Sequence, residues 1–404
     1  MPNSIIYSRP LCLLREKESR ESISTHFQPY IDSAHSMENT PQPISVNNQH
    51  GTMTIKSELS MIDGKMVDIL QGDSGSFCHL CKCSRNEAND VTQILGGFTI
   101  EKSFEQMTAI WNSLEDGSLR YNQEERYGQC HRPMTKKSMF FVAIMHQKLR
   151  SLDHCLKLLY HLVSGQTHTW SESNANVKQA LSAAKKEIID HVRVTCGFLL
   201  DCPTTIGGNT NSGPIAERFF SPESRMHICS KILKEDDRSN FQTLLSYFNR
   251  ILSITQHCDE SKSVNPQKLK DLGLDLMLHH RRSFGFARIS PTVHQMAAHA
   301  WELFEITEGK PISTYSEQAG EAWNKHIRAF KSGPGARARQ SSIMVNTQDN
   351  FTRMLIQTHP RIVRYRRFLN CTRCTRHGHT VRSCPLNVHM ALSEEKAMIE
   401  ECFI

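Results

Sequence analysis

Apolar residues recur at helical spacing through the middle of the chain. Between Lys136 and Leu162 they fall on one face of a helix and are Phe140, Ile144, Leu149, Leu152, Leu156 and Leu159. This periodicity predicts a long helix with a buried face. The segments IAERFF and HICSKIL continue the helical pattern, and Ser290-Pro291 has the residue types favoured at a helix N-cap and first position. We therefore predict that helices dominate residues 136–310.

Two stretches lack this pattern. Ser33 to His50 is rich in Ser, Asn, Gln and Pro with little apolar periodicity, so it is predicted to be a loop or linker. Cys202 to Pro214 is rich in Gly, Asn and Thr and is too polar for a core, so it is predicted to be a turn. A short apolar segment, PLCLL, lies near the start of the chain, and we find no internal repeat.

The composition is that of a soluble globular protein. The chain has 404 residues, 38% of them hydrophobic and 22% charged, enough for two or three domains. Its longest apolar stretch, around Met139 to Met145, is far shorter than the roughly 20 residues that span a bilayer, and the start is not a secretory signal. We expect an intracellular protein with no membrane association, whose 14 cysteines are reduced.

Positive charge is concentrated towards the C-terminus. Between Lys325 and Arg382 there are 13 Lys or Arg residues and one acidic residue, Asp349, which gives +12, whereas the chain as a whole carries +7. The remainder therefore sums to −5. Such basic blocks commonly contact phosphates of nucleic acids, and the alternative is a solvated basic tail.

A second feature of the basic region is a compact set of metal-ligand residues. Cys371, Cys374, His379 and Cys384 follow the Cys-x2-Cys-x4-His-x4-Cys spacing of a zinc knuckle. A loop this short has almost no core of its own, and zinc must therefore supply the free energy of folding. In zinc-finger peptides the free energy of zinc binding is about 10–16 kcal/mol. The knuckle indicates zinc and a nucleic-acid partner.

Cys78 and Cys81 form a separate Cys-x2-Cys pair, which supplies half of a zinc site. His294 and His299 are candidates for the other half. On a regular helix these histidines point about 140° apart, so both reach one metal only near a helix end or a local distortion. From the spacing alone they can equally be surface or core histidines.

Several ordered blocks resemble the Transib transposases and the catalytic subunit of the V(D)J recombinase. PTVHQMAAHAWELFE is similar to the two-histidine helix of that family, and SEQAGEAWNKHIRAF is similar to the helix that holds its last catalytic glutamate. SMIDGKMVD upstream of FCHLC resembles the segment with the second catalytic aspartate and the paired zinc cysteines. GGNTNSGPIAERFF resembles the Gly/Asn-rich transposase stretch, and PLCLL resembles a strand of the ribonuclease-H-like core.

The resemblance implies roles for individual residues. It implies one Zn²⁺ ion held by Cys78, Cys81, His294 and His299, which with the knuckle makes two zinc sites. It also implies that Asp63 is the second carboxylate of an Asp-Asp-Glu triad and Glu321 the third. Glu317, four residues earlier on the same helical face, is the rival of Glu321. Such carboxylates hold Mg²⁺ or Mn²⁺ and support DNA nicking and hairpin-forming transesterification.

The resemblance also implies partners. The knuckle is expected to bind DNA at terminal inverted repeats or recombination-signal-like sequences. Arginines beside and within it are expected to contact phosphates; they are Arg364, Arg366, Arg367, Arg373 and Arg376. We expect a nuclear protein that forms a homodimer, with an accessory recombinase subunit as a further candidate partner.

The first catalytic aspartate of the family lies upstream of the PLCLL-like strand, and residues 1–9 contain no acidic residue. We therefore expect this chain to lack cleavage activity, either as an incomplete form of a longer recombinase or as a domesticated remnant. The alternative function is a non-catalytic zinc-knuckle protein that binds nucleic acid, although the knuckle has no aromatic residue to stack on bases.

The predicted fold is α/β, with a partial ribonuclease-H-like core, a large helical zinc-binding insertion and a small zinc knuckle. The expected order is a core segment (1–70), a Cys-pair segment (71–135), the helical region with the His pair (136–310), a helical segment with the last glutamate (311–365), the knuckle (366–386) and a tail (387–404).

Overall fold

The computed structural model describes residues 19–315, except residues 39, 47–48, 55–59, 63, 76, 82, 85, 101–102, 116–126, 136–139, 168–173, 202–210, 231, 258 and 260. Residues Glu16–Ser313 belong to one compact unit of the chain. The architecture below is that of this unit.

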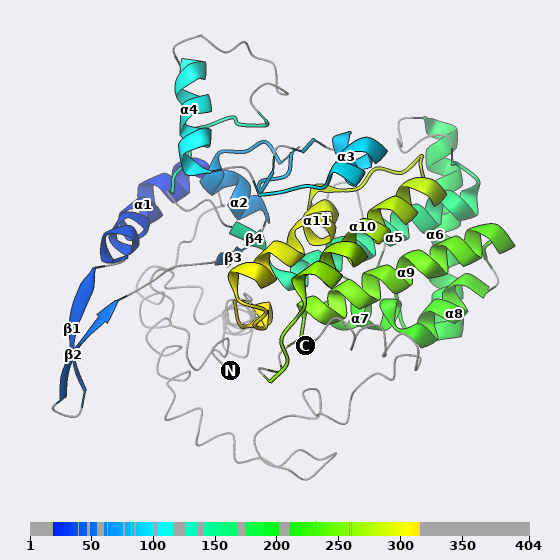
Figure 1. Ribbon diagram of the computed structural model, residues 1–404. Coiled ribbons are helices and arrows are strands. Elements are labelled where there is room, and N and C mark those ends of the chain that lie inside the picture. Colours follow the sequence, from blue (N-terminus) through cyan, green and yellow to red (C-terminus); the bar gives the residue numbers. More distant parts are fainter. Residues whose placement is uncertain are drawn as a thin grey trace, which may run out of the picture. The chain divides into compact units, whose positions relative to one another are not determined.

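Helices make up most of the unit, as the apolar periodicity predicted. In Figure 1 the longer helices run side by side in a bundle. The helices of this bundle are α5 (Ile144–Ser164), α6 (Ala175–Cys196), α7 (Gly213–Phe220), α8 (Pro222–Ser230), α9 (Glu235–Thr255), α10 (Pro266–Ser283) and α11 (Pro291–Ile306). The α/β prediction holds in outline, since helices predominate and strands form only small pairs in the described part of the chain.

Helix α5 shows how the sequence produces this core. Leu152, Leu156 and Leu159 lie on one face of the helix and are fully buried. Gly165 ends the helix with φ of 70°, a left-handed conformation that glycine adopts without strain. The predicted helix from Lys136 was too long at its start, because Phe140–Val142 forms strand β4.

Aromatic side chains fill the centre of the bundle. Phe220 of α7 and Phe248 of α9 are buried with ring centroids 5.8 Å apart, and Phe241 packs edge-on against Phe284. Burial of an aromatic ring removes 150–250 Å² from water, so these contacts contribute strongly to the stability of the bundle.

Strand β3 (Ser60–Ile62) pairs with β4 (Phe140–Val142) in parallel, with Met61 opposite Phe141. Helix α2 (Gly64–Gln71) follows β3 directly after residue 63. Parallel pairing requires a crossover connection, and here the intervening chain carries α2, the Cys pair and further short helices. These are η1 (Glu87–Asn89), α3 (Val91–Gly96) and α4 (Phe104–Glu115).

The prediction of a loop from Ser33 to His50 was wrong. Helix α1 extends over Arg20–Met37, and Pro41–Val46 (β1) and Gln49–Thr54 (β2) form an antiparallel hairpin that projects away from the bundle (Figure 1). Val46 pairs with Gln49, which leaves two residues between the strands. The described residues of both strands are largely exposed, and apolar alternation in the sequence is limited to Ile44 and Val46, which is too short to predict a strand.

Helix α1 is held by backbone carbonyls of other segments. The Arg20 guanidinium donates to the Ile69 carbonyl at 2.7 Å and to the Arg132 carbonyl, and Gln28 Nε2 donates to the Met134 carbonyl at 2.8 Å. Burial lowers the pKa of Arg20 from its usual value. These contacts join α1 to α2 and to residues 132–134.

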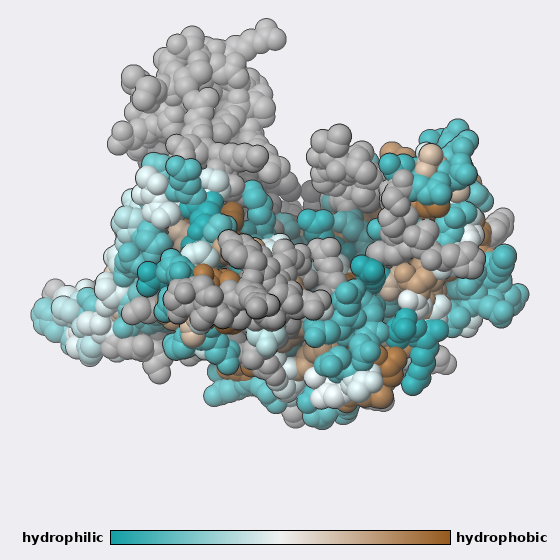
Figure 2. All heavy atoms as spheres, turned by 90° about the horizontal axis from the view of Figure 1, so that it is seen from above, coloured by the Kyte–Doolittle hydropathy of each residue, from teal (hydrophilic) through white to brown (hydrophobic). Residues whose placement is uncertain are grey.

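Most of the described surface in Figure 2 is hydrophilic, with scattered apolar areas. The most exposed large apolar side chains are Val194, Leu95 and Leu199. Among the described residues, no helix is both long and apolar enough to cross a membrane. The final described element is a short 3₁₀ helix, η2 (Ile312–Tyr315).

Candidate metal centre

A tight turn presents the two cysteines. Phe77 and Ser84 form an antiparallel bridge, and the Cys78 N–H donates to the Cys83 carbonyl at 2.9 Å. The turn encloses Cys78 and Cys81, which are only 2% and 3% exposed. Both thiols therefore lie in the interior.

The histidines come from the start of α11. Ser290 caps this helix by accepting a hydrogen bond from the Val293 N–H at 3.3 Å, and Pro291 is its first residue, as the sequence predicted. His294 therefore lies in the first turn and His299 in the third. Both are buried, with exposed fractions of 1% and 0%.

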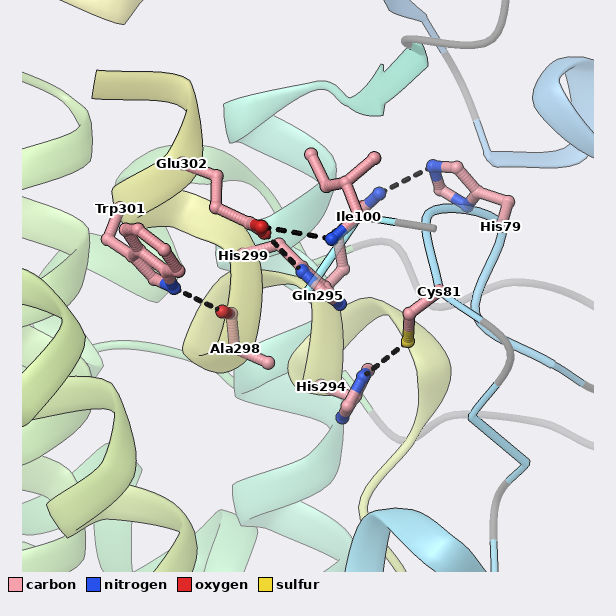
Figure 3. A network of polar contacts seen from close by, with 9 residues as sticks. All are labelled: His79, Cys81, Ile100, His294, Gln295, Ala298, His299, Trp301 and Glu302. Carbon is pink, nitrogen blue, oxygen red and sulfur yellow. Dashed lines mark hydrogen bonds and ion pairs between the residues drawn. The ribbon is translucent and has the colours of Figure 1, made fainter. Parts of the chain in front are cut away.

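These four residues converge on one point. One potential ligand atom from each of Cys78, Cys81, His294 and His299 lies within 4.8 Å of all the others. Cys81 Sγ is 3.4 Å from His294 Nε2 (Figure 3). Zn–S and Zn–N bonds of about 2.3 and 2.0–2.1 Å place sulfur and nitrogen about 3.6 Å apart in a tetrahedral site. The spacing therefore fits a four-coordinate metal ion.

An outer carboxylate orients one of the histidines. His299 Nδ1 is 2.6 Å from Glu302 Oε2, and the Ile100 N–H donates to Glu302 Oε1 at 2.9 Å. Burial lowers the pKa of His299, but Cys78 and Glu302 outweigh this effect and raise it to about 9. A carboxylate behind a metal-binding histidine fixes its tautomer and ring orientation.

His299 Nε2 is the ring nitrogen that does not contact Glu302, so it is the atom through which a metal can bind. Among the described residues, His299 Nε2 has no hydrogen-bond partner although it is buried, and the same holds for His294 Nδ1. An unsatisfied buried nitrogen is costly in a protein interior. A metal bond to His299 Nε2 satisfies that atom, so the residues present fit a metal ion.

The surroundings of Cys81 favour its protonated thiol over the thiolate. A hydrogen bond with Cys78 lowers its pKa, but a hydrogen bond with Cys83 and burial outweigh this and raise the pKa to about 12. A metal ion binds the thiolate, so binding must release a proton. Cys83 is also buried, but its Sγ contacts the Ser84 carbonyl oxygen at 3.2 Å.

A cleft lies beside this centre. It has a volume of about 480 Å³ and is bordered by the first residues of α2 and α11 and by the cysteine turn. Its charged and titratable lining residues are Lys65, Asp68, His79, His146 and Arg150. The centre and the cleft are connected, because His79 Nε2 contacts Gln295 Nε2 between the two ligand histidines (Figure 3).

The other predicted site residues lie outside the described part of the chain. They are Asp63, Glu317, Glu321, the knuckle ligands Cys371, Cys374, His379 and Cys384, and Arg364, Arg366, Arg367, Arg373 and Arg376. The second zinc site and the carboxylate triad therefore stay predictions.

Sequence reasoning missed Glu302 and the cleft lined by Lys65 and Arg150. The available signal for Glu302 was its position three residues after His299, where two side chains of a helix meet. The cleft had no such signal, because its residues come from α2, the cysteine turn, α5 and α11. No protein-family model matches the chain, and a search of curated proteins found no match.

Proposed function

We propose that this chain is a zinc- and DNA-binding protein of the Asp-Asp-Glu recombinase and transposase type. The observation that carries the proposal is the meeting of Cys78 and Cys81 with His294 and His299. Cys81 and His294 are 213 positions apart in sequence. This is the ligand set that the resemblance implies.

Zinc is the ion that best suits these donors. Two thiolates and two imidazoles form a tetrahedral set typical of structural zinc sites, and calcium and magnesium prefer oxygen ligands. All four positions are filled by protein side chains, so no position is left open for a substrate. We assign the site a structural role, in which zinc joins the cysteine turn to α11.

The strand arrangement supports a ribonuclease-H-like core. The segment SMIDGKMVD, similar to the family segment with the second catalytic aspartate, contains β3 and most of α2, and β3 is parallel to β4. In the chain, Asp63 lies between β3 and α2. On the resemblance, Asp63 and Glu321 would hold Mg²⁺ or Mn²⁺, which activates water or a 3′-hydroxyl for phosphodiester chemistry.

The cleft supports a nucleic-acid partner. Lys65 and Arg150 supply two positive charges to its lining against one carboxylate, Asp68, and Arg150 also pairs with Asp153 at 3.4 Å. Lysine and arginine in such a lining can contact the phosphates of a DNA strand, and these contacts weaken as salt rises. The C-terminal arginines and the knuckle add a second cationic region in the sequence.

Fluorescence anisotropy with a labelled DNA duplex tests the proposal. The full chain should bind in a salt-dependent manner, and removal of zinc with a chelator should abolish binding. Cys371→Ser with Cys374→Ser should weaken DNA binding while leaving the helical unit folded. Binding that survives complete zinc removal, or no binding at low salt, would contradict the proposal.

A further inference from the structure

Both oxygens of the Glu302 carboxylate are engaged by different parts of the chain. Oε2 accepts from His299 Nδ1 at 2.6 Å, within α11, and Oε1 accepts from the Ile100 N–H at 2.9 Å, 202 positions away (Figure 3). The Glu302 side chain is only 11% exposed. Water therefore has little access to compete for these two bonds.

The first bond decides which nitrogen of His299 can bind a metal. His299 binds a metal as the neutral imidazole, which has one N–H donor and one acceptor nitrogen. Because a carboxylate only accepts, the hydrogen must lie on Nδ1 when His299 donates to Glu302. The lone pair is then on Nε2, the buried nitrogen that has no hydrogen-bond partner among the described residues.

The second bond connects this histidine to the segment that follows α3. Gly97 ends α3 with φ of 78°, and residues 97–100 then pass the metal centre. Phe98 packs edge-on against His294, with ring centroids 4.6 Å apart and an interplanar angle of 84°. The same short segment therefore contacts one ligand histidine directly and the other through Glu302.

We propose that Glu302 is a positioning residue of the metal centre, and that it couples zinc binding to the seating of residues 97–100. This inference rests on the proposed zinc site. Coupling between two events is reciprocal, so zinc should stabilise the segment by the same free energy by which the seated segment raises zinc affinity.

The primary test compares Glu302→Gln with the matched variant Glu305→Gln on the exposed side of the same helix. A glutamine has one acceptor oxygen and presents an NH₂ group where the second acceptor was. Zinc affinity of Glu302→Gln, measured by competition with a chromogenic chelator, should fall about 10–100-fold, as for other outer-shell partners. Glu305→Gln should match the native protein, and a Glu302→Gln affinity within twofold of native overturns the inference.

Two spectroscopic readouts separate positioning from general destabilisation. With Co²⁺ in place of zinc, the visible bands of Glu302→Gln should change in energy or intensity, while its far-ultraviolet circular dichroism stays native. Amide exchange in the native protein provides a test without a variant: zinc should slow exchange at Ile100. Exchange at Ile100 that is unaffected by zinc overturns the coupling, even if Glu302→Gln fails to fold.

These outcomes also distinguish this inference from the proposed function. If the native protein binds no zinc at the Cys₂His₂ centre, the proposed function fails and this inference fails with it. If the native protein and Glu302→Gln bind zinc equally well, only the role of Glu302 is wrong.

Discussion

His154 of α5 and His280 of α10 form a buried imidazole pair, with their Nε2 atoms 3.0 Å apart. Burial, followed by the charge of Lys157, lowers the pKa of His154 to about 4. Burial, followed by His154, His279 and Arg281, holds the pKa of His280 well below 6.5. The pair is therefore neutral at physiological pH, with one ring donating and the other accepting.

The pair should make the stability of the bundle sensitive to acid. Because the pKa of each histidine is lower in the folded protein than in the unfolded chain, the unfolded chain takes up protons first. The contribution of the neutral histidine pair to the free energy of unfolding is complete above about pH 6.5 and is lost as pH falls towards 4. For His154 this contribution is on the order of 3 kcal/mol. Urea denaturation at about pH 7 and about pH 5 measures the part of this loss that occurs above pH 5.

Replacing both rings isolates their effect from acid release of the metal. In the double variant His154→Leu with His280→Leu, the difference in unfolding free energy between the two pH values should shrink. The exposed His227→Gln should behave as the native protein does. An unchanged pH dependence in the double variant would refute the assignment.

At Gly273, helix α10 passes close to the backbone of helix α11. A Cβ atom at residue 273 would overlap the carbonyl oxygen of Ala297. Gly273→Ala should therefore cost about 1–3 kcal/mol in unfolding free energy, since backbone must move to relieve the overlap. Gly96→Ala, where a Cβ meets nothing within 4 Å, is the control and should not destabilise the protein. Equal thermal midpoints for both variants would contradict the packing argument.

Lys65 and Arg150 at the cleft should contribute to DNA affinity. Lys65→Ala and Arg150→Ala should each weaken binding for all DNA sequences alike and reduce the slope of log affinity against log salt by about 1. Lys178→Ala removes an exposed cation from α6, which contributes no residue to the lining of the cleft, and should leave the slope unchanged. Slopes that are identical in all these proteins would exclude the cleft from the DNA interface.

Cys81 and Cys83 provide a matched pair of buried thiols with different expected roles. Cys81 Sγ faces His294, whereas Cys83 Sγ contacts the Ser84 carbonyl. Cys81→Ser should abolish zinc binding at the Cys₂His₂ centre and lower the thermal midpoint, and Cys83→Ser should retain the metal. Loss of zinc from Cys83→Ser with retention in Cys81→Ser would reverse the ligand assignment.

Zinc affinity should rise with pH, because the pKa of the Cys81 thiol is raised to about 12 and binding displaces its proton.

Local signals in the sequence predicted the helices well. Ser290-Pro291 located the start of α11, and the leucines of α5 identified its buried face. The hairpin of β1 and β2 was missed because its apolar alternation is limited to Ile44 and Val46, and the remaining short-range indication was Asn47-Asn48 between the strands. Strand β4 was predicted as part of the long helix because Phe140 also fits helical periodicity.

The metal centre could not be derived from spacing alone. His294 and His299 are five residues apart, and nothing local connects them to a Cys pair more than 200 residues earlier. The resemblance supplied that connection. The sequence also did not predict the pairing of His154 with His280, because this pairing depends on how α5 and α10 pack in three dimensions.

The most direct test of the account is the metal content and coordination of the full chain carrying Cys371→Ser and Cys374→Ser, which removes the predicted knuckle site. Elemental analysis should find one zinc ion per chain, and zinc X-ray absorption should show two sulfur and two nitrogen ligands. A folded protein without zinc, or a zinc ion with only oxygen and nitrogen ligands, would contradict the central claim that Cys78, Cys81, His294 and His299 form a structural zinc site.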